Sequence, residues 1–270
     1  MKMRRGYPLS LVMIQPDAMP GSYLNDGKTL DIILEQVMAE AQMIADMGFD
    51  GFILQNMHDG PVSQTARPET IGFMTRLGVE LRRHFPDLVL GILVNWDGLA
   101  SLAVAEAVDA DFVRVEHLYT GVSIANTGLM SGQCAAICEM RKRLGSRIPV
   151  FADVQEVNST YLMAKPKAQA AVDVVRSAFA DGVFVSGSNT GESLQYVREI
   201  KALLPGVPVF LGGGATGDNI RELMTHYDGV SVATWIKNGN MRNPIDKDRA
   251  ALFLAEIQAA RELREKEESQ

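Results

Sequence analysis

The sequence predicts an α/β fold, specifically a TIM barrel in which eight parallel strands and eight helices alternate as (β/α)8. Eight short apolar runs recur along the chain, and a longer amphipathic segment follows each of them. Near-continuous apolar runs of this kind are typical of parallel strands that are buried on both faces. The chain length of 270 residues also fits one such barrel, which usually takes about 250.

The eight predicted strands are rich in Val, Ile, Leu and Phe, which favour buried strands. In chain order they span residues 9–14, 51–56, 88–95, 112–117, 149–154, 182–187, 207–212 and 229–234. No linker or change in composition interrupts the alternation. We therefore expect a single domain over residues 1–270, whose tail from about residue 262 frays at the end of the last helix.

Helix boundaries follow from capping residues and prolines. The first helix shows the apolar spacing of an amphipathic helix over 30–44, with Thr29 as its N-cap and Gly48 at its end. Pro68 opens the second helix, at a position where a missing N–H costs nothing. Three later helices are predicted to open at Pro166, Thr216 and Asp246.

Composition excludes several classes of partner. The net charge of −7 argues against nucleic acid, because a phosphate backbone requires a basic face. No apolar stretch approaches the roughly 18 residues of a membrane span. Cys134 and Cys138 are the two cysteines, and we interpret them as buried thiols rather than as a metal or redox pair. These features predict a cytoplasmic protein.

The stretch "FLGGGATGDN" (210–219) has the glycine spacing of a dinucleotide-binding fingerprint. That fingerprint lies in the first strand–helix turn of its unit, with an acidic residue about 20 positions further on. Here the glycines follow the seventh strand, and the next strand ends at Thr234 without a carboxylate. The position therefore argues against a nicotinamide cofactor.

A phosphate site fits the same position better, because the loops after strands seven and eight of a TIM barrel frequently bind phosphate. Gly213 and Gly214 would offer backbone N–H groups, and the helix predicted to start near Thr216 would add its positive dipole end. The alternative is that the glycines only form a turn. The other predicted ligand contacts lie after strands six and eight, at Ser186, Gly187, Thr234 and Lys237.

Charged residues at the carboxyl ends of the strands are the candidate catalytic groups, because active sites of this fold lie there. We predict Asp153 as a base or as the stabiliser of an oxocarbenium ion, Glu116 as an acid, and Arg114 as their partner. An Arg114–Asp153 ion pair with a purely structural role is the open alternative. Three amide side chains at strand ends are predicted to bind the substrate: Gln15, Asn56 and Asn95.

Metal and nucleophilic catalysis have less support in the sequence. Glu116, His117 and Asp153 are suitable metal ligands by residue type, but adjacent residues of a regular strand face opposite ways, and no metal motif occurs. We assign no metal ligands and leave the cofactor unknown, with a divalent metal as an alternative. The chain has no G-x-S-x-G motif and no Lys within a predicted strand.

The chain resembles the BtpA family, whose barrel is of the ribulose-phosphate-binding type. The likeness is carried by "GFDGFILQNMHDGP" (48–61), "DADFVRVEHLYTG" (109–121), "DGVFVSGSNTG" (181–191), "GGGATGDNI" (212–220) and "DGVSVATWIKNG" (228–239). The resemblance implies a role in photosystem I biogenesis or, from the label of some members, a nucleosidase. Gln15-Pro16-Asp17 stands where the family usually has His-Leu-Gly, and Gln55 stands where it has Glu.

Three functions remain in competition. The first is an enzyme that acts on a phosphorylated sugar or nucleoside-like compound by glycosidic cleavage, isomerisation or aldol-type chemistry. The second is a non-catalytic assembly or regulatory factor on a retained phosphate-binding barrel. The third is a flavin enzyme, because a phosphate site of this kind also suits FMN. In each case we expect a phosphorylated small molecule as the ligand and a homo-oligomer.

Overall fold

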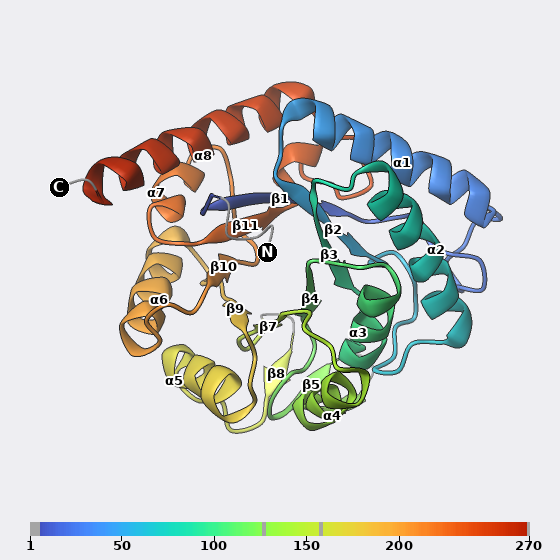
Figure 1. Ribbon diagram of the computed structural model, residues 1–270, viewed down its shortest axis with the longest axis horizontal. Helices are drawn as coiled ribbons and strands as arrows, with labels where there is room; N and C mark the ends of the chain where they lie inside the picture. The colour runs from blue at the N-terminus through green and yellow to red at the C-terminus, as the bar shows by residue number, and fades with distance from the viewer. Residues whose placement is uncertain (1–5, 126–127, 157–158, 269–270) are drawn as a thin grey trace.

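The computed structural model describes residues 6–125, 128–156 and 159–268. Eight parallel strands close into a barrel, and each neighbours the next along the circle. Their bounds are β1 (Leu9–Ile14), β2 (Gly51–Gln55), β3 (Val89–Leu93), β4 (Phe112–Val115), β7 (Val150–Asp153), β9 (Gly182–Phe184), β10 (Val209–Leu211) and β11 (Gly229–Val232). Each lies within one predicted apolar run, and the closed barrel confirms the predicted fold class (Figure 1).

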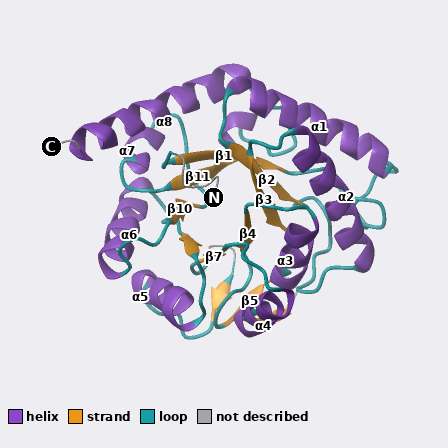
Figure 2. Cartoon of the chain, in the orientation of Figure 1, coloured by secondary structure: helices purple, strands orange, loops and turns teal. Residues whose placement is uncertain are grey.

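Helices surround the barrel on the outside (Figure 2). They are α1 (Leu30–Met47), α2 (Pro68–His84), α3 (Gly98–Ala107), α4 (Cys134–Leu144), α5 (Lys167–Val172), α6 (Thr190–Leu203), α7 (Ile220–Met224) and α8 (Lys247–Glu268). A π-helical turn (Asp173–Ser177) extends α5, and a 3-10 turn (Trp235–Lys237) follows β11. The part of the chain from 262 to 268 is helical, and 269–270 lie outside the described residues. Across the described ranges, no helix has the length and apolar character needed to cross a membrane.

Most predicted helix starts are confirmed. The Thr29 side chain accepts a hydrogen bond from the Ile32 amide at the start of α1, and Pro68 is the first residue of α2. The start predicted near Thr216 is wrong, because α7 begins at Ile220. The amide of Thr216 donates to Asn219 Oδ1 at 2.8 Å, so these residues form a turn that precedes a helix of five residues.

A second, three-stranded antiparallel sheet was not predicted. It consists of β5 (Val122–Ala125), β6 (Gly128–Ser131) and β8 (Thr160–Tyr161), with β5 in the middle. β5 and β6 belong to the segment between β4 and α4, and β8 belongs to the segment between β7 and α5. The alternation of apolar and polar residues in "VSIA" is a signal for the first of these strands.

Four phenylalanines fill one side of the barrel interior: Phe112, Phe151, Phe184 and Phe210, one each from β4, β7, β9 and β10. Their ring centroids lie between 5.1 and 6.5 Å apart, within the range of favourable aromatic contacts. The guanidinium of Arg114 lies 4.3 Å from the centroid of the Phe184 ring. The aromatic cluster therefore forms an apolar floor beneath the charged end of the barrel.

Candidate active site

The predicted ion pair between Arg114 and Asp153 is present. Nε and Nη2 of Arg114 donate to the two carboxylate oxygens of Asp153, both at 2.8 Å, and Nη1 donates to Ser231 Oγ at 3.2 Å. Glu116 Oε1 lies 3.7 Å from Nη2 of the same arginine. The Arg114 and Asp153 side chains are only 5% and 9% exposed, so this is a buried bidentate pair.

The parallel register brings these residues together. β4 and β7 are neighbours, with Arg114 opposite Phe151, so the carboxyl end of β7 lies beside that of β4. Arg114 and Glu116 are two residues apart and extend from the same face of the chain, as strand alternation predicts. Because the apolar floor removes water from below, each charge in this cluster depends on another charge or a polar partner.

Strand alternation predicts that His117 faces away from the cluster, but its ring lies against two of the carboxylates. Its Nε2 lies 3.1 Å from Glu156 Oε2 and its Nδ1 lies 3.8 Å from Glu116 Oε2. The first lacks the geometry of a hydrogen bond and the second is too long for one, so both are charge contacts. The ring also lies against Trp96, with 4.8 Å between ring centroids. The prediction is wrong because β4 ends at Val115, and strand alternation does not extend to residue 117.

The acidic groups have different proton affinities because their surroundings differ. Burial raises the pKa of Asp153 to about 6 despite the Arg114 charge, and the like charges of Glu116 and Glu156 add to the effect. Burial also acts on Glu116, but His117 and Arg114 outweigh it and lower the pKa of Glu116. Burial alone would lower the pKa of His117, whereas the two glutamates raise it to about 9. Asp153 is thus the group that can exchange a proton near neutrality.

A cavity of about 270 Å³ opens beside this cluster in the mouth of the barrel. It brings together seven of the residues predicted for the site, namely Arg114, Glu116, Asp153, Ser186, Gly187, Gly213 and Gly214. Glu156 and Lys167 line it as well. We call this space the mouth cavity.

The glycine loop after β10 presents open backbone to the mouth cavity. A Cβ added at Gly213 or Gly214 would meet no atom within 4 Å, and Gly214 has a φ of +78°. Neither amide donates to any other described residue of the chain. Gly217 serves packing instead, since a Cβ there would lie 2.6 Å from the Trp235 ring. The motif therefore leaves two free N–H groups at the cavity and uses its last glycine for a close contact.

The loop after β9 lines the cavity but offers fewer donors. The amide of Gly187 donates to Ser193 Oγ at 2.9 Å. The amide and hydroxyl of Ser188 both donate to Glu192 Oε2, at 2.9 and 2.7 Å. These bonds close the start of α6, so Ser186 and Gly187 shape the wall while the Gly187 amide is already occupied.

Lys167, which the sequence did not single out, supplies a cation to the mouth cavity. It is the first residue of α5, and its Nζ donates to the Ser186 carbonyl at 2.6 Å. Burial lowers the pKa of Lys167, and Glu192, Glu156 and Asp153 oppose this shift. The sequence held a signal for Lys167. A cation in the first turn of a helix is unfavourable beside the positive end of the helix dipole, so a lysine at that position indicates another role.

Three predicted ligand residues lie elsewhere. Lys237 is buried and its Nζ lies 2.5 Å from Glu40 Oε1 on α1, so its charge is already paired. Together with Gln15 it lines a second cavity of about 380 Å³, which we call the α1 cavity. Thr234 is exposed, and its carbonyl accepts the amides of Lys237 and Gly239. None of the three lines the mouth cavity.

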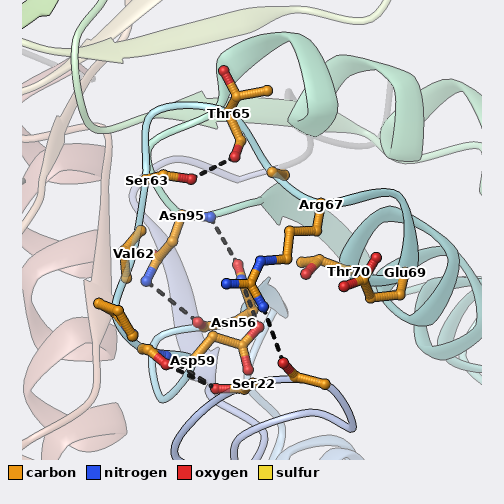
Figure 3. A pocket seen from close by; sticks show the side chains of 14 residues that line it. Ser22, Asn56, Asp59, Val62, Ser63, Thr65, Arg67, Glu69, Thr70 and Asn95 are labelled. Atoms are coloured by element: carbon orange, nitrogen blue, oxygen red, sulfur yellow. Dashed lines mark hydrogen bonds between the residues drawn. The ribbon is translucent and has the colours of Figure 1, made fainter.

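The predicted asparagines Asn56 and Asn95 hold the loops after β2 and β3 together (Figure 3). Asn56 Oδ1 accepts the Asn95 amide at 2.7 Å, and Asn56 Nδ2 donates to Asp59 Oδ2 at 2.9 Å. Both residues line a cavity of only about 50 Å³ beside Arg67. Their amide groups are therefore engaged in structure at this place.

A chain of buried amides connects the two larger cavities. Gln15 Nε2 donates to Gln55 Oε1 at 2.9 Å. Gln55 Nε2 in turn donates to Asn95 Oδ1 at 2.8 Å and to Glu116 Oε2 at 3.2 Å. Gln55 was not among the predicted ligands, although it ends β2 at the position where site residues of this fold lie.

No group of three or more His, Cys, Asp or Glu side chains suited to a metal ion is found among residues 6–125, 128–156 and 159–268.

The BtpA family model matches residues 9–259, which is nearly the whole barrel. This chain belongs to the BtpA family. An uncharacterised protein of Thermococcus kodakarensis is 33% identical over 264 residues, covering 95% of this chain and 96% of the relative. The photosystem I biogenesis protein BtpA of a Synechocystis strain is 32% identical over 233 residues, covering 84% of this chain and 80% of the relative.

Solved structures agree with the fold. An archaeal fructose 1,6-bisphosphate aldolase superposes with a TM-score of 0.54 at 14% identity, covering 94% of each chain. At that identity the likeness extends to the barrel fold alone.

Proposed function

We propose that this BtpA-family barrel is an enzyme that acts on a phosphorylated sugar or nucleoside-like substrate by proton transfer, as in isomerisation or aldol-type chemistry. The observation that carries the proposal is that two unbonded backbone N–H groups and a carboxyl group with a pKa of about 6 line one cavity. The first suits a phosphate and the second suits proton transfer at neutral pH. The aldolase with the same fold is consistent with this chemistry.

The phosphate would lie against the amides of Gly213 and Gly214, with the ammonium of Lys167 as its counter-charge. Lys167 takes the place that the sequence had suggested for Lys237. The φ of Gly214 lies in the left-handed region, so the backbone of Gly213 and Gly214 would form a concave anion site. Such a site does not need a long helix. The mouth cavity of about 270 Å³ is close to the lower end of the roughly 300–1,000 Å³ usual for ligand sites.

The remainder of the substrate would extend toward Asp153 and Glu116. Asp153 would remove a proton from a carbon or hydroxyl next to the reacting carbonyl and return it at the end of the reaction. Arg114 would hold Asp153 in place through its two hydrogen bonds and balance the negative charge that develops. Glu116 stays ionised in this scheme, because its pKa is lowered.

The test is a binding comparison of sugar phosphates with their dephosphorylated forms, using calorimetry on wild type, Lys167→Met and Lys165→Met. Loss of one charge-assisted hydrogen bond should weaken a phosphate ligand about 10-fold or more in Lys167→Met. Lys165 pairs with Asp173 and does not line the mouth cavity, so Lys165→Met is the matched control. Equal affinity for the phosphorylated and dephosphorylated forms would refute the phosphate site.

A non-catalytic assembly factor is the second candidate, and the biogenesis role in the name of the Synechocystis relative favours it. The two candidates differ in turnover. If the ligands that bind at the mouth cavity of the wild-type protein are recovered unchanged after prolonged incubation, the assembly role is the better account. A homo-oligomeric state and a cytoplasmic location stay predictions under either function.

A further inference from the structure

The α1 cavity is larger than the mouth cavity and lies on the other side of the amide chain. At about 380 Å³ it falls within the usual range of small-molecule sites. α1 supplies part of its wall, and the segments that follow β1, β2 and β11 supply the rest. Val37 and Met43 of α1 give it an apolar side, and Gln15, His58, Glu40 and Lys237 give it a polar side.

Three buried polar atoms of residues at this cavity have no hydrogen-bond partner among the described residues: Gln15 Oε1, His58 Nε2 and Glu40 Oε1. Glu40 Oε1 is in an ion pair with Lys237, which leaves the first two without any partner. Gln15 and His58 are each only 8% exposed. The orientation of the Gln15 amide is fixed, because its Nε2 donates to Gln55. The unpaired atom of this lining residue is therefore its oxygen, which is an acceptor. Buried polar atoms are normally paired, so two unpaired atoms at one cavity point to a missing ligand.

The charges around the cavity are already paired with one another. Lys237 pairs with Glu40, and Arg242 Nη1 lies 3.7 Å from Asp17 Oδ1. Burial lowers the pKa of His58, and the charges of Arg242 and Lys237 lower it further, so the ring is neutral at pH 7. A charged ligand would have to break one of these pairs. The atoms that remain for a ligand are therefore a neutral acceptor and a neutral ring nitrogen.

We propose that the α1 cavity binds a small uncharged heterocycle that contains a cyclic amide, with an N–H next to a carbonyl. The ring N–H would donate to Gln15 Oε1, and the ring carbonyl would accept from His58 in the tautomer protonated at Nε2. The flat faces of the ring would pack against Val37 and Met43. This site needs neither a phosphate nor the mouth cavity, so it goes beyond the proposed enzymatic function.

Uracil is the probe, because it is small, uncharged at neutral pH and carries the N–H and carbonyl pair. Calorimetry should show saturable binding to the wild-type protein. Gln15→Leu and His58→Leu should each weaken it about 10-fold, as expected for one buried hydrogen bond. 1,3-Dimethyluracil lacks both N–H groups. Its affinity for the wild-type protein should be no higher than the affinity of uracil for Gln15→Leu.

Gln36→Leu is the matched control, because Gln36 is an exposed residue at the rim of the same cavity. Uracil should bind this variant as it binds the wild type. Since Gln15 and His58 belong to different loops, one variant still tests the site if the other fails to fold, and circular dichroism identifies such a failure.

Several outcomes would overturn the proposal. These are absence of saturable uracil binding, equal affinity for 1,3-dimethyluracil, and an equal loss in Gln36→Leu. Loss of uracil binding in Lys167→Met, or displacement of uracil by inorganic phosphate, would place the ligand in the mouth cavity instead. Failure of the phosphate site alone leaves uracil binding intact, so the two proposals fail separately.

Discussion

The two halves of the barrel mouth end in different chemistry. The carboxyl ends of β1, β2 and β3 carry neutral amides: Gln55 ends β2, while Gln15 and Asn95 follow β1 and β3, and the three bond to one another. β4 and β7 carry the ionised Arg114 and Asp153 at their carboxyl ends. Both halves lie at the same end of the closed barrel. Being at the carboxyl end of a strand therefore does not by itself decide whether a residue is charged.

The difference teaches which half can do acid–base chemistry. Amides satisfy one another in a buried place at little cost, whereas buried charges persist only with close partners. In the charged half, burial and like charges bring the pKa of Asp153 to about 6. In the amide half, the side chains of Gln15, Gln55 and Asn95 cannot ionise. The following predictions test this division, from the largest expected effect to the smallest.

Arg114→Met should be the most destabilising of these changes. It leaves Asp153 buried without the cation that it pairs with, and breaking a buried pair typically costs about 3–5 kcal/mol. Urea denaturation measures the free energy of unfolding. The double variant Arg114→Met, Asp153→Leu removes both partners and should recover part of that loss. A single variant as stable as wild type would show that the two halves do not differ in this respect.

Asp153→Asn should reduce turnover of the physiological substrate about 100-fold or more while the phosphate group still binds. Asparagine keeps the size of the side chain but cannot take up a proton. Asp173→Asn is the control, because Asp173 pairs with Lys165 outside the mouth cavity. If Asp153→Asn lowers the thermal midpoint but leaves turnover per folded molecule unchanged, Asp153 is only the structural anchor of Arg114.

The charged half should also make stability depend on pH through His117. Its pKa is about 9 in the folded protein and about 6.5 when unfolded, so the folded state binds the proton more tightly. The stabilisation is fully present below pH 6.5 and is lost as the pH rises through 9. We expect a loss of about 1–3 kcal/mol over this window, measured as the free energy of unfolding. His117→Gln should remove this part of the pH dependence, and an unchanged profile would contradict the assigned shift.

Gln55→Leu should have the smallest effect of the four. It removes the acceptor of Gln15 and a donor to Asn95 and Glu116. Buried groups left without partners cost about 1–3 kcal/mol. Gln42→Leu is the control, because Gln42 makes an exposed hydrogen bond to Asp46 and should lose little. A Gln55→Leu protein as stable as this control would mean that the amides are not a connected network.

The barrel was predictable because buried parallel strands leave continuous apolar runs, and each strand of the barrel lies in such a run. The directions of side chains in the loops were not predictable from the sequence. Lys237 follows the last strand, as a phosphate ligand would, yet it turns toward Glu40 on α1. Lys167 lies in no strand but reaches the mouth cavity from the start of α5. A loop position fixes the end of the barrel at which a side chain lies, while its direction depends on tertiary partners.

The amide chain from Gln15 to Glu116 also determines how protons travel. Amide groups do not ionise near neutrality, so the line through Gln15 and Gln55 acts as an insulator for proton conduction. It is also polarised, since Gln55 must direct its nitrogen toward Glu116 to keep the contact at 3.2 Å attractive. A proton released from Asp153 would therefore not pass along this line, whereas the mouth cavity that Asp153 lines remains open to it.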